Sequence, residues 1–233
     1  MNLQKSHFEL DGHGVTIYSA SKPEILFLQP VDAHDEALLD GEMEAMKSCT
    51  KPFALAAFRV TDWNRDLSPW EAPPVFGKDP FDGGAEETFH FVVDRLLPKV
   101  RTVLSLSGDE NWCIGGYSLA GLFSLWAVTR TGLFSAVAAV SPSVWFPGWP
   151  EYVRKHPIQA KAVYLSLGDR EEKTKNPVMA TVGDRIQELY DALQTDYAVT
   201  LEWNTGNHFQ NAEQRTAKAF CWVANQHGRI EMP

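Results

Sequence analysis

The chain has 233 residues, of which 44% are hydrophobic and 22% are charged, and its formal net charge is −9 at pH 7. This length suits one large α/β domain with a substantial core. The negative charge would repel phosphate backbones and anionic lipids, so nucleic-acid and membrane-surface partners are not expected. No apolar run approaches the roughly 20 residues that a membrane-spanning helix needs.

The cysteines and the N-terminus bear on the cellular compartment. The three cysteines, Cys49, Cys113 and Cys221, are far apart and have neither zinc-ligand spacing nor the pattern of a disulfide scaffold. The first residues, MNLQKSHFELDGHGV, contain no apolar segment of a secretory signal. These features predict a cytoplasmic protein with reduced cysteines.

The first quarter of the chain is predicted to form several strands and one helix. Two short alternating runs, 7–10 and 15–20, flank a glycine-containing loop and predict an antiparallel hairpin. The continuously apolar runs 24–30 and 52–60 predict strands buried on both faces. Between them, 35–48 has helical spacing, with acidic residues in its first turn that suit the helix dipole.

After a long polar and aromatic connection, helices and strands alternate to the end of the chain. Helices are expected at 85–103, 119–130, 176–193 and 210–227, and strands at 111–117, 134–142, 161–168 and 197–204. This order predicts an α/β fold, with a mostly parallel sheet of about eight strands, an N-terminal antiparallel hairpin and helices on both faces. We expect a single domain over 1–233 without a separate lid domain. Ligands of such sheets bind beyond the carboxyl ends of the strands.

A serine lies where one of these strands meets a helix, in the sequence GGYSLAG. A nucleophile elbow places a serine on a strained strand-to-helix turn, with small residues two positions before and after it. Gly116 and Ala120 fit that pattern around Ser118. The backbone N–H of Leu119, at the helix N-terminus, could stabilise an oxyanion. Taken alone, the motif is equally consistent with a tight turn and a capping serine.

A serine hydroxyl needs a base to become a nucleophile. Of the seven histidines, His208 lies in a short loop directly after the last predicted strand, at the same sheet edge as Ser118. An acid that orients this histidine could come from the loop after 161–168, which offers Asp169, Glu171 and Glu172. The order serine, acid, histidine is that of α/β-hydrolases. Three candidates in this order, each just after a strand, favour a serine hydrolase.

With these residues, the sequence resembles the putative-esterase family of α/β-hydrolases, which includes esterase D, feruloyl esterases and enterochelin esterases. The resemblance rests on GGYSLAG at Ser118, SPSVWF at 141–146, GDRE after 161–168, and GNH ending at His208. It implies an α/β-hydrolase fold, with Ser118 as nucleophile and His208 as base. In the family the acid usually lies three residues after the glycine that ends its strand, which selects Glu171, with Asp169 as the alternative.

The resemblance also implies that a second oxyanion N–H comes from the loop after the third strand. Family members often carry His-Gly there, whereas this chain has Gln29 and Pro30. Because proline has no N–H, the donor must be Val31 or a neighbour.

Two aromatic-rich loops follow strands and are expected to flank the serine. Their candidate substrate-binding residues are Trp63, Trp145 and Phe146, since aromatic walls suit sugar faces, phenolic acyl groups or flat apolar chains. No metal or cofactor pattern is evident in the sequence. The expected partner is a small-molecule ester, and the oligomeric state stays open between a monomer and a homodimer.

Three functions fit this pattern. The first is a carboxylic-ester hydrolase that works through an acyl-serine intermediate on Ser118. The second is an acyltransferase with the same residues, which differs only in whether an alcohol outcompetes water. The third is a non-catalytic binding module with a degenerate oxyanion loop near Val31.

Overall fold

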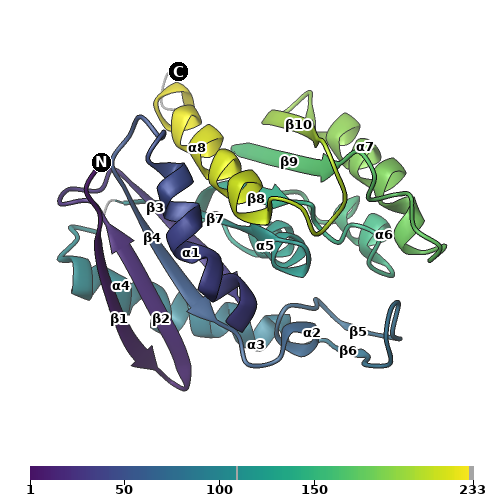
Figure 1. Cartoon of the computed structure of the whole chain (residues 1–233), viewed down its shortest axis with the longest axis horizontal. Helices are drawn as coiled ribbons and strands as arrows, with labels where there is room; N and C mark the ends of the chain where they lie inside the picture. Colours follow the sequence, from purple (N-terminus) through teal and green to yellow (C-terminus); the bar gives the residue numbers. More distant parts are fainter. Residues whose placement is uncertain (109, 231–233) are drawn as a thin grey trace.

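The protein is built on an eight-stranded, mostly parallel sheet with the strand order β1-β2-β4-β3-β7-β8-β9-β10. The computed structural model describes residues 1–108 and 110–230. Strand β1 pairs antiparallel with β2, and β2 pairs antiparallel with β4, whereas the other neighbours are parallel. The predicted hairpin and α/β fold are therefore confirmed (Figure 1). The strands are β1 (Gln4–Leu10), β2 (His13–Ser19), β3 (Ile25–Val31), β4 (Phe53–Arg59), β7 (Asn111–Tyr117), β8 (Phe134–Val140), β9 (Ala162–Gly168) and β10 (Ala198–Asn204).

Helices cover both faces of this sheet, and each face has its own apolar core. One face is covered by α1 (Ala33–Met46) and α8 (Ala212–Ile230), which lie side by side (Figure 1). Strands β3 and β9 are buried throughout and β4 is buried except for Arg59, as continuous apolar runs require of strands sandwiched between helices. The helices of the other face are α3 (Ala85–His90), η1 (Phe91–Leu96), α4 (Leu97–Leu104), α5 (Leu119–Arg130) and α7 (Val182–Leu193).

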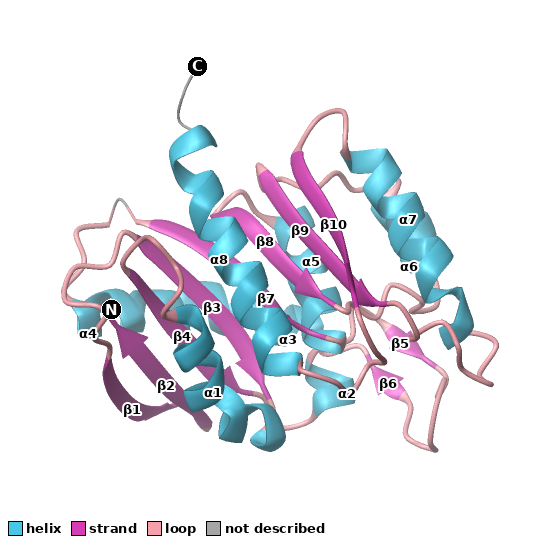
Figure 2. Ribbon diagram, turned by 45° about the horizontal axis from the view of Figure 1, so that its top comes forward, coloured by secondary structure: helices cyan, strands magenta, loops and turns pink. Residues whose placement is uncertain are grey.

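The structure differs from the sequence-based prediction in four local features. The helix expected at 85–103 is divided by the π-helical turn η1, and the one expected at 176–193 starts with the short 3₁₀ turn η2 (Met179–Thr181). The long connection after β4 contains α2 (Trp63–Asp66) and a small antiparallel pair, β5 (Glu71–Ala72) and β6 (Phe81–Asp82) (Figure 2). A further short helix that was not predicted, α6 (Trp149–Val153), follows β8.

The cysteines also differ from the expectation, because Cys49 and Cys221 form a disulfide. They are 172 residues apart in sequence, but α8 packs against α1 and brings Cys221 to the loop that follows α1. Disulfides persist in oxidising compartments, so this pair removes the ground on which a reducing cytoplasm was predicted. Cys113 is free and buried, and burial raises the pKa of its thiol to about 12.

Removing this disulfide is expected to lower stability and leave the carboxyl edge of the sheet intact. Cys49 precedes the amino end of β4, the edge opposite to the carboxyl ends of the parallel strands. Replacing Cys49 and Cys221 by serine should lower the free energy of unfolding by about 2–4 kcal/mol, because the unfolded chain loses a cross-link. Urea unfolding with and without reductant measures this effect. The reductant should destabilise the wild type but not the double variant, and an equal response in both would contradict the prediction.

A buried carboxyl group lies between α1 and the sheet. The side chain of Glu42 is 3% exposed, and its Oε2 accepts a hydrogen bond of 3.1 Å from Nε2 of Gln29. Its Oε1 has no hydrogen-bond partner among the described residues. Burial raises the pKa of Glu42 to about 8 from its ordinary value of 4.5. The folded protein therefore holds a proton on Glu42 that the unfolded chain loses above about pH 4.5.

Because the folded state binds this extra proton between pH 4.5 and about 8, Glu42 weakens folding progressively as the pH rises through that window. Glu42→Gln supplies a permanently neutral side chain of similar shape. The stability of this variant relative to the wild type should thus increase with pH, by up to about 1.4 kcal/mol per pH unit. Urea unfolding at pH 5 and pH 8 tests this, with the exposed Glu44→Gln on the same helix as the control. A difference between Glu42→Gln and wild type that does not change with pH would refute it.

Candidate active site

The sequence-predicted residues Ser118, Glu171 and His208 come together at the carboxyl edge of the sheet. Ser118 lies between β7 and α5, Glu171 lies three residues after the end of β9, and His208 lies in the loop between β10 and α8. Three loops that are distant in sequence therefore converge because their strands are parallel and near neighbours in the sheet.

Ser118 occupies a sharp strand-to-helix turn with φ 58° and ψ −120°. This left-handed region is uncommon for a non-glycine residue and is typical of strained functional turns. Neighbouring backbone fits closely around the turn: a Cβ on Gly116 would lie 2.6 Å from the Cβ of Ala120. Residue 116 must therefore be glycine for this turn to form.

A chain of two hydrogen bonds joins the three side chains. Nε2 of His208 lies 3.0 Å from Oγ of Ser118, and Nδ1 of His208 lies 2.7 Å from Oε2 of Glu171. A carboxylate can only accept, so Nδ1 carries the proton and donates it to Glu171. Nε2 is then free to accept the hydroxyl proton of Ser118. This is the geometry that general-base activation of a serine requires.

Glu171, rather than Asp169, is the acid that contacts His208. Burial raises the pKa of Glu171, but hydrogen bonding and attraction from His208, together with Ser141 and Gly168, outweigh it and lower the pKa below its ordinary value. Oγ of Ser141 and the N–H of Gly168 each donate to Oε1 of Glu171 at 2.7 Å. Asp169 instead accepts from the N–H of Gly206 at 2.8 Å. It thereby stabilises the backbone of the histidine loop.

The two expected oxyanion donors differ in what the structure shows. The N–H of Leu119 lies at the N-terminus of α5, and none of the described residues accepts a hydrogen bond from it. Val31 is the last residue of β3, and its carbonyl accepts from the N–H of Val60 at 2.9 Å. Val31 also pairs with Arg59 in the parallel ladder between β3 and β4. Its role as the second oxyanion donor stays a prediction.

The aromatic candidates divide into buried and accessible residues. Phe146 has no exposed surface, and its ring lies 5.0 Å from that of Phe81. It belongs to the core, so its expected place in a substrate wall is wrong. Trp145 is 9% exposed, and Trp63 lines a cleft beside the ends of β3 and β4. Phe209 is a further accessible aromatic residue, which the sequence-based prediction did not include. It is 89% exposed, and its ring lies 5.4 Å from that of His208.

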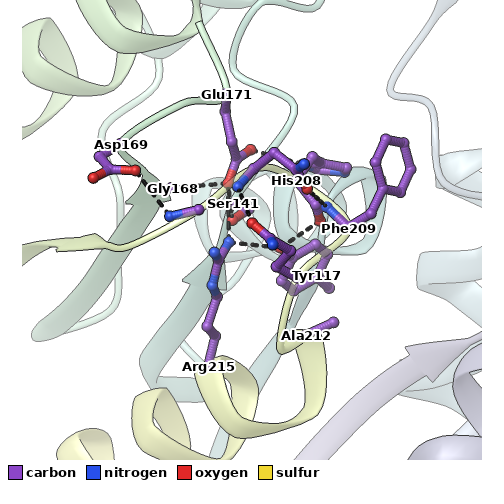
Figure 3. A network of polar contacts seen from close by, with 12 residues as sticks. Tyr117, Ser141, Gly168, Asp169, Glu171, His208, Phe209, Ala212 and Arg215 are labelled. Carbon is purple, nitrogen blue, oxygen red and sulfur yellow. Dashed lines mark hydrogen bonds and ion pairs between the residues drawn. The ribbon is translucent and has the colours of Figure 1, made fainter. Parts of the chain in front are cut away.

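Residues that hold the three loops together were also missed. The hydroxyl of Tyr117 donates to the carbonyl of His208 at 2.7 Å, and Arg215 of α8 contacts both Tyr117 and Glu171 (Figure 3). Ser141 lies in the motif SPSVWF, but that motif does not predict its hydrogen bond to Glu171. An arginine in an amphipathic helix gives no sequence signal for such a role.

No helix in residues 1–108 and 110–230 is both long and apolar enough to cross a membrane. Within the same ranges, no group of three or more His, Cys, Asp or Glu side chains is arranged to hold a metal ion.

Together, the sheet order and the sharp strand-to-helix turn at Ser118 are those of an α/β-hydrolase fold. The chain belongs to the putative esterase family, whose model, described as "Putative esterase", matches residues 52–229. A search of curated proteins finds no match.

Several solved structures share this fold at low sequence identity. The siderophore hydrolase EstA from Aspergillus nidulans is 19% identical, with a TM-score of 0.70 over 96% of this chain and 94% of that one. An IroE-like serine hydrolase from Shewanella oneidensis is 16% identical, with a TM-score of 0.73 over 97% and 79%. The enterobactin and salmochelin hydrolase IroE is 17% identical, with a TM-score of 0.59 over 95% and 93%.

Proposed function

We propose that this protein is a serine hydrolase that cleaves a carboxylic ester through an acyl-serine intermediate. The observation that carries the proposal is the hydrogen-bonded chain from Ser118 through His208 to Glu171, with spacings of 3.0 and 2.7 Å. Membership of the putative esterase family supports the same reaction class.

In the proposed reaction, His208 takes the hydroxyl proton as Oγ of Ser118 attacks the ester carbonyl. Glu171 holds the imidazole in the required tautomer and stabilises the imidazolium that forms. The N–H of Leu119 stabilises the oxyanion, and a second donor near Val31 completes the hole. His208 then gives its proton to the leaving alcohol. Water resolves the acyl-serine with His208 again as the base.

We propose a small ester with an aromatic or sugar-linked group as the substrate. The residues that support this are Phe209, whose exposed ring lies beside His208, the partly buried Trp63, and Trp145, which is 9% exposed. Phe76 is 52% exposed, and its ring packs edge-on against Trp145 at 6.3 Å, which widens the aromatic surface. The names of the structural neighbours make ester-linked siderophores one class to include in a substrate panel.

Hydrolysis of short p-nitrophenyl esters by the purified protein tests the reaction class. Turnover that releases free acid supports a hydrolase. If added acceptor alcohols instead yield new esters at the expense of acid, the protein is an acyltransferase on the same residues. Absence of turnover together with absence of fluorophosphonate labelling would leave only the binding-module alternative and refute the enzyme proposal.

A further inference from the structure

Arg215 is a buried charged residue in the early part of α8, and the proposed reaction assigns it no role. Its side chain is 3% exposed. Nη1 lies 3.1 Å from the hydroxyl of Tyr117 and 3.3 Å from Oε1 of Glu171. Nη2 donates to the carbonyl of Thr205 at 3.1 Å. One guanidinium group thus reaches the segments that carry the serine, the acid and the histidine, as Figure 3 shows.

The space for this guanidinium depends on two glycines. A Cβ on Gly168 would lie 3.1 Å from Nη1 of Arg215 and 2.5 Å from the carbonyl oxygen of Gly206. A Cβ on Gly206 would lie 3.3 Å from Nη2, and this residue has a φ of 115°, which side chains rarely adopt. Gly168 ends β9 just before the loop of Glu171, and Gly206 lies in the loop of His208. The loops therefore leave room for the arginine at the point where they meet.

The contacts of Arg215 reach His208 by two routes. The first is mechanical: Arg215 donates to the oxygen of Tyr117, and Tyr117 donates to the carbonyl of His208 at 2.7 Å. The second is electrostatic, because Glu171 uses Oε2 for His208 and Oε1 for Arg215. A guanidinium stays protonated at any working pH, so it partly compensates the carboxylate that faces the imidazole.

We propose that Arg215 is a positioning residue of the hydrolase, which fixes the histidine loop through Tyr117 and balances the charge of Glu171. The inference rests on the proposed function. Without the arginine charge, uncompensated Glu171 would favour the imidazolium form of His208, which is inactive as a base. The fall of the rate on the acid side should then begin at a higher pH. Among the described residues, the titratable groups that face His208 and Arg215 are Glu171, Tyr117 and Asp35. Neither Arg215→Met nor Arg215→Lys changes any of them.

The test compares Arg215→Met, Arg215→Lys and Tyr117→Phe with the wild type. The readouts are the rate constant for fluorophosphonate labelling of Ser118 from pH 5 to 9, and kcat and KM for p-nitrophenyl acetate. Arg215→Met should lower the labelling rate and kcat about 10- to 100-fold, with KM nearly unchanged, and shift the acid limb to higher pH. Arg215→Lys should restore the position of the acid limb but only part of kcat. Tyr117→Phe should lower kcat about tenfold without moving the limb.

Arg101→Met is the matched control, because Arg101 also pairs with a largely buried carboxylate, that of Glu110 at 3.4 Å. Arg101 lies on α4, and Glu110 precedes the amino end of β7, at the edge opposite to Ser118. This variant should lose stability and keep its kinetics and pH profile. Thermal unfolding of every variant separates loss of fold from loss of rate.

The outcomes distinguish the two proposals. If the wild type labels at Ser118 and folded Arg215→Met has the wild-type rate and acid limb, Arg215 is only structural and the inference fails. If Arg215→Met does not fold, Arg215→Lys and Tyr117→Phe decide, and rates within about twofold of wild type in both would overturn it. If the wild type itself neither labels nor turns over, the proposed function fails and takes this inference with it.

Discussion

Ser118→Ala is expected to lower kcat for p-nitrophenyl ester hydrolysis by at least about 10³-fold. The hydroxyl removed is the atom that His208 contacts at 3.0 Å and that would form the acyl bond. The remaining activity would come from substrate binding and the oxyanion donors alone. Alanine keeps the Cβ of Ser118 and removes only the hydroxyl, so the backbone at φ 58° is no more strained than in the wild type and the loss would not reflect unfolding.

Ser143 provides the control for this experiment. Its hydroxyl lies 3.5 Å from that of Ser118, which makes it the nearest alternative nucleophile in the site. Among the described residues, however, it makes no hydrogen bond to His208. Ser143→Ala should therefore keep its labelling by a fluorophosphonate. Full activity in Ser118→Ala, or loss of labelling only in Ser143→Ala, would show that the wrong serine has been assigned.

The second large effect is expected at the acid. Glu171→Gln should lower kcat by about 10³- to 10⁴-fold, because an amide at this position can present an N–H to His208 and favour the wrong tautomer. The neighbouring donors from Ser141 and Gly168, both at 2.7 Å from Oε1, would hold the carbonyl oxygen of the amide. The amide nitrogen would then face Nδ1 of His208.

Asp169→Asn is the matched exchange two residues away. Oδ1 of Asp169 accepts from the N–H of Gly206 at 2.8 Å, and an asparagine oxygen can accept the same bond. This variant should lose less than about tenfold in kcat, since it alters no group in contact with His208. Steady-state kinetics of both variants on one ester decide the assignment. A larger loss in Asp169→Asn than in Glu171→Gln would contradict the choice of Glu171.

Much of the fold was predictable because the burial of each element leaves a local pattern in the sequence. The central strands lie between two helical layers and therefore read as continuous apolar runs, as in β3 and β9. The same patterns predicted where the site lies, because the carboxyl ends of parallel strands all meet at one edge of the sheet. Ser118, Glu171 and His208 could be selected because each comes just after such a strand.

What the sequence did not reveal depends on contacts between distant segments. The pairing of Cys49 with Cys221 follows from the packing of α8 on α1, across 172 residues. In the sequence, Arg215 is one of several polar residues in a predicted amphipathic helix. Only the folded chain shows that its side chain is 3% exposed and lies beside Glu171. Phe146 was predicted to lie in an accessible aromatic loop, yet its side chain is buried in the core. In each case the partner is supplied by tertiary structure.

The most direct test of the central claim is to identify the residue that a fluorophosphonate labels in the native wild-type protein. The account predicts one adduct, mapped by peptide mass spectrometry to Ser118, that forms in the folded protein and not after denaturation in urea. Labelling should be lost in Ser118→Ala and strongly slowed in Glu171→Gln. An adduct on another residue, or none at all in a folded sample, would contradict the assignment of Ser118, His208 and Glu171 as the catalytic residues.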